Sequence, residues 1–351
     1  MTRHPVTRSR AAARWLTVAA LAVIAAAVSS RGAPAVGKVQ QTAQPPATLS
    51  WPDPPAPARI QFVRVLTPAT GGGRPSRLRR FFDFITGGTS ITAELVQPYG
   101  IAADERGRVF VADTFAETIH VFDTRSDRYS SISLEGQAPI GVATVGDRLF
   151  VTDSVGGRVT CLDQEGRRLW TIGPEQGLQR PTGIAADGSR LYVVDTLAHQ
   201  VVRIGLTGQV TGRFGSHGSD AGQFNYPTNI ARGTGDRLLV TDSMNFRVQA
   251  FSLQGEYLGG FGQLGDGSGD FNRPKGIALD SDGHVYVVEG LADVVQIFDE
   301  RGRFLLAFGE SGAREGQFWL PTGIAIRDDV IYVADAANRR VQVFRYLKER
   351  S

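Results

Sequence analysis

Short apolar runs alternate with polar, glycine-rich breaks along most of the chain, and this pattern predicts β-strands. In "GSRLYVVDTLAHQVVRIG" (residues 188–205), Asp195 ends the run LYVV, and the run VVRI follows five residues later. Runs of this length bounded by Gly, Asp, Asn and Pro are typical of strands joined by tight turns. No segment after residue 97 keeps a helical period. The sequence therefore predicts an all-β domain.

The pattern of strands and breaks returns six times. An acidic residue closes the second apolar run of each unit, at spacings of about 40 to 47 residues. These acids are Asp113, Asp153, Asp195, Asp242, Glu289 and Asp335. Each unit divides into four short strands, as in "GIA", "RLYVVD", "HQVVRIG" and "QVTGRFG" for the third unit. Repeats of this length mark propellers, solenoids or arrays.

Six four-stranded units predict a six-bladed β-propeller of antiparallel blades over residues 97–351. One such unit cannot bury both of its faces, and radial repetition solves this problem. A linear stack is the weaker alternative, because its ends would need caps. The sixth unit ends after its third strand, whereas a lone alternating strand, "ARIQFVRVL", precedes the repeats at 58–66. We expect this strand to pair with the last blade and close the ring over 58–351.

The N-terminal segment predicts export. Residues 1–35 combine four early arginines, an apolar core of residues 15–28 and the end "APA". This is the pattern of a secretory signal peptide, and the core is short for a spanning helix. We expect a periplasmic or extracellular protein, tethered to the inner membrane if the signal stays uncleaved. The Pro-rich residues 36–57 predict an extended linker.

A basic and aromatic segment, "SRLRRFFDFI", lies within residues 71–88, before the first repeat. It predicts a short helix that caps the ring, with Leu78, Phe81, Phe82 and Ile85 on one face. The alternative is a peripheral membrane contact or docking helix through 76–85, because basic and aromatic residues combine there. Ten residues make a weak anchor, which favours the cap.

Charge and cysteine content narrow the function classes. The whole chain has 38 Lys and Arg against 35 Asp and Glu, but five of the arginines lie in residues 1–35. From Gln97 onward we count 26 basic and 32 acidic residues, a net of −6. A mildly acidic body does not favour nucleic-acid binding. The single cysteine, Cys161, cannot form an internal disulfide, and its strand position favours a small buried side chain.

The repeats resemble the NHL repeat family of β-propellers. The resemblance rests on "PTGIAIRDDVIYVADAANRRVQVF" (residues 321–344), on "VTDSMNFRVQAF" (residues 240–251) and on the loops "GQFNYP", "GDFNRP" and "GQFWLP". It implies the propeller fold over about 97–351 plus the closing strand. Function does not follow, because propellers host many activities.

The six repeated acids are interpreted as structural. An acid at the end of the second strand can accept bonds from turn amides, and a catalytic acid would be needed only once. An Arg follows five residues later in three of the repeats, at Arg158, Arg247 and Arg340. We expect these arginines to pair with a neighbouring blade's acid, with an anion-binding ring as the alternative.

Candidate binding residues lie on the face that holds the turn after the second strand and the loop into the next blade. Phe224, Phe271 and Phe318 of the "GQF" type loops are expected to fill the gaps between blades. The surface candidates, selected because aromatic and polar residues group on one rim, are Tyr226, Phe246, Arg273, Trp319, Asn245 and Asn338. We call this the loop face.

No catalytic set or metal site is predicted. Zinc needs three or four converging ligands, and only His199 and His217 are expected to share a face. The primary hypothesis is an exported, non-enzymatic, monomeric propeller without a cofactor, which binds a protein partner or small ligand through its loop face. The alternative is a metal-dependent hydrolase or lyase, similar to lactonases or to amidating lyases, with a divalent cation at the axial opening.

Overall fold

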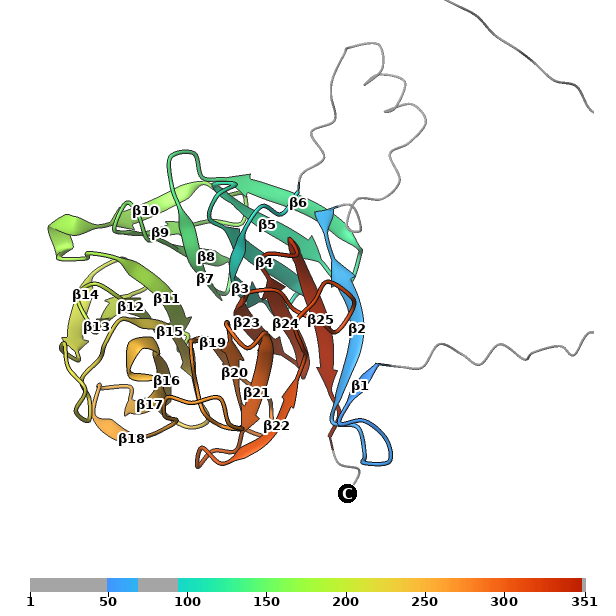
Figure 1. Ribbon diagram of the computed structural model, residues 1–351. Helices are drawn as coiled ribbons and strands as arrows, with labels where there is room; N and C mark the ends of the chain where they lie inside the picture. The colour runs from blue at the N-terminus through green and yellow to red at the C-terminus, as the bar shows by residue number, and fades with distance from the viewer. Residues whose placement is uncertain (1–48, 69–93, 349–351) are drawn as a thin grey trace, which may run out of the picture. The chain divides into compact units, whose positions relative to one another are not determined.

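Six antiparallel sheets form a ring in the computed structural model, which describes residues 49–68 and 94–348 (Figure 1). The innermost strands β3, β7, β11, β15, β19 and β23 contact one another in sequence, and β23 contacts β3 again. The circuit is therefore closed, and the predicted all-β, six-bladed propeller is confirmed. The predicted signal peptide (1–35) and the basic-aromatic segment (71–88) lie outside the described residues.

Each blade runs from an inner strand to an outer one. Blade 1 holds β3 (Pro98–Ala103), β4 (Arg108–Asp113), β5 (Thr118–Asp123) and β6 (Arg128–Ser133). Blade 2 holds β7 (Pro139–Val145), β8 (Arg148–Asp153), β9 (Arg158–Leu162) and β10 (Arg168–Ile172). Blade 3 holds β11 (Pro181–Ala186), β12 (Arg190–Asp195), β13 (Gln200–Gly205) and β14 (Val210–Phe214). A short 3-10 turn, η1 (Pro174–Gln176), precedes β11.

The second half of the ring repeats this order. Blade 4 holds β15 (Pro227–Arg232), β16 (Arg237–Asp242), β17 (Arg247–Ser252) and β18 (Tyr257–Phe261), with the 3-10 turn η2 (Ser243–Asn245) after β16. Blade 5 holds β19 (Pro274–Leu279), β20 (Val285–Glu289), β21 (Val294–Phe298) and β22 (Phe304–Phe308). Blade 6 holds β23 (Pro321–Arg327), β24 (Val330–Asp335) and β25 (Arg340–Tyr346).

Blade 6 is completed from the N-terminal side of the chain. Strand β2 (Ile60–Leu66) pairs antiparallel with β25, and the two lie side by side in Figure 1, blue against red. The short strand β1 (Ser50–Trp51) adds a fifth strand to this sheet. Trp51 packs on Phe308 and Phe344, with ring centroids 5.8 and 5.7 Å apart. The end of the predicted linker is thus part of the blade rather than extended free chain.

The hydrophobic core consists of six clusters, one in each gap between neighbouring blades. Phe224, Phe271 and Phe318 are fully buried in three of these gaps. Cys161 is buried between blades 2 and 3, where burial raises the pKa of its thiol to about 11. The cores therefore hold the blades to one another as well as each blade to itself.

The glycine in the "P-x-G" motif of the inner strands allows the backbones of adjacent blades to touch. A Cβ on Gly141 would overlap the carbonyl oxygen of Thr182 in blade 3, and one on Gly323 would overlap that of Tyr99 in blade 1. A larger residue at either position would force the inner strands apart.

Within residues 49–68 and 94–348, no helix is long and apolar enough to cross a membrane.

Candidate functional site

The six repeated acids accept hydrogen bonds from the loop that leads into their own blade. Asp195 accepts hydrogen bonds from the backbone amides of Gln179 and Arg180, at 2.9 and 2.7 Å. Glu289 does the same for Asn272 and Arg273, at 2.9 and 2.7 Å. All six acids are buried, and each accepts at least one such amide from the residues before the first strand. A buried carboxylate with these donors is satisfied without a ligand.

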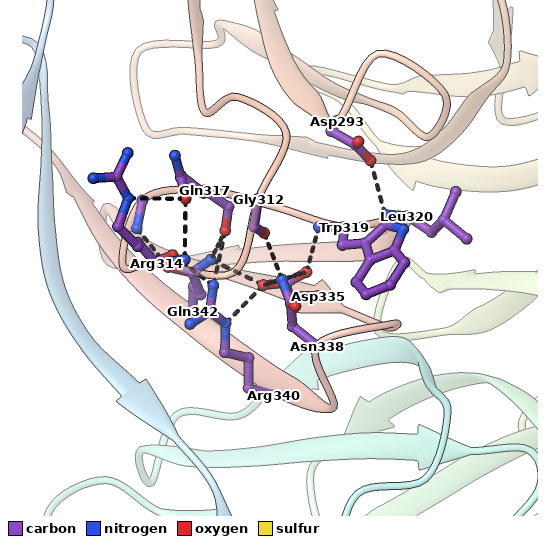
Figure 2. Close-up of polar contacts among 11 residues, drawn as sticks. Asp293, Gly312, Arg314, Gln317, Trp319, Leu320, Asp335, Asn338, Arg340 and Gln342 are labelled. Carbon is purple, nitrogen blue, oxygen red and sulfur yellow. Dashed lines mark hydrogen bonds and ion pairs between the residues drawn. The ribbon is translucent and has the colours of Figure 1, made fainter.

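Blades 4 and 6 surround the acid with side chains as well. Asp335 accepts the Trp319 amide at 2.8 Å and bonds from Asn338, Arg340 and Gln342, as Figure 2 shows. Asp242 has the equivalent partners Asn245, Arg247 and Gln249. Arg158, Arg247 and Arg340 pair with the acid of their own blade, so the expected pairing with a neighbouring blade is wrong. The reason is that β-strands two and three are hydrogen-bonded neighbours, which places acid and Arg opposite each other.

A second repeated contact, a hydrogen bond between neighbouring blades, was not predicted from the sequence. In blades 1, 3 and 4 the residue after the acid donates its hydroxyl to the carbonyl of the proline that starts the next blade. Thr114 reaches Pro139 at 2.8 Å, and Thr196 reaches Pro227 at 2.7 Å. Ser243 bonds to Pro274 at 2.6 Å. The recurrence of Ser or Thr after the acid could have indicated this hydrogen bond. The acceptor, however, lies in the next repeat, so a single repeat does not reveal it.

The predicted surface residues differ in how free their side chains are. Trp319 and Tyr226 are 56% and 44% exposed. Phe246 packs against the core between blades 4 and 5. The Asn245 and Asn338 amide groups donate to the carbonyls of Gly218 and Gly312 and to the nearby acids. Of the six candidates, the exposed ones are therefore Trp319, Tyr226 and Arg273.

A cavity of about 480 Å³ opens on the loop face, at the start of the inner strands of several blades. Three basic side chains line it: Arg180, Arg273 and Lys275. Its other polar lining groups are hydroxyls, and the described residues contribute no carboxylate to it. Those hydroxyls belong to Tyr99, Thr182, Thr196, Tyr226, Thr228 and Ser243. We call this cavity the basic mouth.

The charges in the basic mouth are not neutralised by direct partners. Among the described residues, no carboxylate oxygen lies within 4 Å of the charged nitrogens of Arg180, Arg273 or Lys275. Burial lowers the pKa of Lys275, Arg273 adds to this effect, and Glu289 and Asp293 oppose it from farther away. Burial also raises the pKa of Tyr99, so its hydroxyl stays a neutral donor. Such a cavity is suited to an anion, which would relieve the repulsion between the cations.

Asp195 and Glu289, two of the repeated acids, set the backbone positions of Arg180 and Arg273. Arg180 and Arg273 each precede the first-strand proline, and their amides are the ones bound by Asp195 and Glu289. With the backbone fixed in this way, the guanidinium groups remain available to the mouth. Arg273 was among the predicted residues, whereas Arg180 and Lys275 were not. The recurring "RP" dipeptide of residues 180–181 and 273–274 could have indicated Arg180.

The two predicted neighbouring histidines meet beside this mouth. The rings of His199 and His217 have centroids 4.4 Å apart, and His199 lies 4.8 Å from the Tyr226 ring. His199 Nδ1 accepts the backbone amide of Tyr226 at 3.2 Å. In the part of the chain that the structure describes, no group of three or more His, Cys, Asp or Glu is placed to hold a metal ion. His199 is instead a structural contact between blades 3 and 4.

We expect the pKa of His199 to lie below the ordinary 6.5 and to rise in His217→Gln. Burial is the larger cause of the depression and His217 the second, so the variant removes only part of it. Because the folded state then binds fewer protons than the unfolded chain, His199 lowers stability as the pH falls below about 6.5. NMR titration of the imidazole protons measures both values. An unchanged His199 pKa in His217→Gln would contradict this account.

Comparisons with known proteins agree with the six-bladed propeller fold. The NHL repeat family model matches residues 318–344, which span most of the loop and strands around Asp335. The chain is a six-bladed β-propeller that carries an NHL repeat. No curated protein sequence matches it significantly.

Many solved structures share the fold. They include virginiamycin B lyase from Staphylococcus aureus, with 14% identity, a TM-score of 0.56 and coverage of 73% of this chain and 97% of that one. Regucalcin from Agrobacterium tumefaciens, a calcium-binding protein, has 15% identity, a TM-score of 0.57 and coverage of 74% and 93%. An auxiliary nutrient binding protein from Bacteroides thetaiotaomicron has 14% identity, a TM-score of 0.58 and coverage of 73% and 70%. At these identities the likeness concerns the fold alone.

Proposed function

We propose that this propeller is an exported, non-enzymatic binding protein whose basic mouth takes the anionic group of its ligand. The group is a carboxylate, carried by a small molecule or by the acidic end of a protein partner. The observation that supports the proposal is the convergence of Arg180, Arg273 and Lys275 on one cavity without a carboxylate among its described lining residues. Charge-assisted bonds from Arg and Lys are the strongest polar contacts that a protein offers a carboxylate.

The similar folds include a lyase and a calcium-binding protein, but the residues of this mouth do not fit a divalent cation. Calcium takes six to eight oxygen ligands, largely carboxylates and carbonyls, and zinc takes His, Cys or carboxylates. Three cationic side chains in the same cavity would repel such an ion. This donor set supports binding of an anion over metal-dependent catalysis at the loop-face opening.

Exposed side chains around the mouth would add contacts to the rest of the ligand. Trp319 and Tyr226 are exposed on this face, as are Phe115, Met244 and Leu291 in the turns after the second strands. Tyr and Trp supply much of the energy of binding surfaces, and Arg often accompanies them. We therefore propose a charged centre that orients the ligand and an apolar surround that adds affinity.

Calorimetric titration with citrate and with an acidic peptide, Gly-Glu-Glu-Glu, tests the proposal. We expect at least one probe to bind, and Arg273→Gln and Lys275→Gln each to weaken binding about tenfold, the usual loss for one charge-assisted bond. Arg301→Gln is the control, because Arg301 is an exposed cation in the turn between β21 and β22. Citrate binding alone indicates a small ligand, and peptide binding alone indicates an acidic protein segment. If neither binds, or if Arg301→Gln weakens binding equally, the proposal fails.

A further inference from the structure

A second cavity, of about 760 Å³, lies beside blades 5 and 6, where the N-terminal segment with β1 and β2 covers them. It shares no lining residue with the basic mouth. His284, one of its lining residues, lies in the connection from β19 to β20. In an antiparallel blade this connection is at the opposite end of β20 from the turn after Glu289, so the cavity faces away from the loop face. We call it the side cavity.

An Asp–His pair supplies an unusual polar group to the side cavity. The buried Asp280 accepts the amides of Asp282 and His284 at 3.0 and 2.9 Å, and the Tyr286 hydroxyl at 3.0 Å. Its Oδ2 also lies 2.8 Å from His284 Nδ1. A carboxylate with these donors acts as acceptor, so Nδ1 of His284 carries the proton in this contact. In the neutral form of the ring, Nε2 then presents its lone pair.

His284 Nε2 forms no hydrogen bond to a described residue, and the side chain is 27% exposed. The ring is held in place by the Asp280 contact and by Tyr346, whose ring lies 5.5 Å away in an edge-on arrangement. A fixed acceptor on a cavity wall is a group that a ligand donor can satisfy.

The walls and the rim restrict the ligand further. Pro52, Ile60, Ile297 and Leu306 give the cavity apolar walls. At the rim, Asp282 accepts the Tyr346 hydroxyl at 3.0 Å and lies 3.4 Å from Lys348. Lys348 also lies 3.5 Å from Asp329, so this cation already has two carboxylate partners. Arg59 also lines the cavity and already takes part in another contact. Asp282 and the Nε2 lone pair are both acceptors, so we expect a hydrogen-bond donor to be favoured over an added carboxylate.

We propose that the side cavity binds a neutral, mainly apolar molecule that carries a hydroxyl donor, such as a phenol or an aromatic alcohol. Its hydroxyl donates a hydrogen bond to His284 Nε2, and its ring contacts the walls formed by the N-terminal segment and blade 5. This site goes beyond the proposed function of the basic mouth and does not depend on it. Pockets of this kind, apolar with few convergent polar groups, are the usual form of small-molecule sites.

The test is a titration of the full chain with 2-naphthol, followed by its fluorescence. We expect saturable binding at one site, about tenfold weaker binding in His284→Phe, which keeps an aromatic ring but removes the acceptor, and loss of binding in Leu305→Trp. Leu305 lines the cavity and is half exposed, so a larger side chain there fills space without disturbing the core. Lys275→Gln in the basic mouth is the matched control and should bind 2-naphthol like the unaltered protein.

Ligand variants keep the test decisive if His284→Phe folds poorly. 2-Methoxynaphthalene has the same ring without a donor, and we expect it to bind about tenfold more weakly than 2-naphthol. 2-Naphthoate replaces the hydroxyl by a carboxylate and is expected to bind no better than the methoxy compound. The proposal is overturned if 2-naphthol does not bind saturably, if the methoxy compound binds equally well, or if the carboxylate binds most tightly.

Discussion

Asp335→Ala is expected to lower the free energy of unfolding by about 3–5 kcal/mol, the usual cost of removing one partner from a buried ion pair. The Asp335 carboxylate is fully buried, and the paired Arg340 side chain is only 12% exposed. The substitution would leave the guanidinium without its counter-charge and would release the Trp319 amide. Figure 2 shows that the same carboxylate also connects Asn338 and Gln342, so four groups lose an acceptor together. Urea unfolding followed by tryptophan fluorescence measures the loss.

Asp299→Ala is the matched control for this prediction. Asp299 also pairs with an arginine and accepts two backbone amides, but the Arg303 side chain is 74% exposed. Water can replace those contacts, so the expected loss is much smaller than that of Asp335→Ala. Equal losses in the free energy of unfolding of the two variants would show that burial does not decide how much such an aspartate contributes to stability.

The fold could be predicted because its signal is local and repeated. The alternation of short apolar runs with Gly and Asp breaks defines strands without any knowledge of the partners, and six copies leave few ways to bury both faces. The closing strand could be predicted because the last repeat lacked an outer strand. The addition of Trp51 and β1 to that blade had no comparable signal, because a two-residue strand within a Pro-rich segment resembles a linker.

The basic mouth could be predicted only in part. Arg273 and Tyr226 were selected from their place on the loop face. Arg180 has the same repeat position but was not selected, and Lys275 lies two residues further along its repeat; these side chains converge only in the ring. The same applies to Thr196, whose hydroxyl bonds to a proline 31 residues away. Contacts between repeats depend on how blades are turned relative to one another, and a single repeat does not encode this. The side cavity was missed for the same reason, since its walls come from residues 52–60 and from blades 5 and 6.

Removal of residues 1–68 is expected to lower the thermal unfolding midpoint by about 10 °C or more. Ile60 and Leu66 of β2 are buried, and burial of such side chains contributes about 1.5–3 kcal/mol each, before the pairing with β25 is counted. The truncated chain would also expose the edge of β25, and an unpaired edge favours self-association. Calorimetry and light scattering measure the two effects, with a chain that begins at residue 49 as the control.

Supply of the missing strand as a separate peptide distinguishes loss of this pairing from general damage. A peptide of residues 49–68 should restore most of the lost midpoint, because it can pair with β25 along the register from Ile60 to Leu66. The same peptide with Ile60→Asp should fail, since Ile60 is fully buried in the core between blades 5 and 6 and an unpaired charge there is costly. An unchanged midpoint after truncation, or equal rescue by both peptides, would mean that the ring closes without β2.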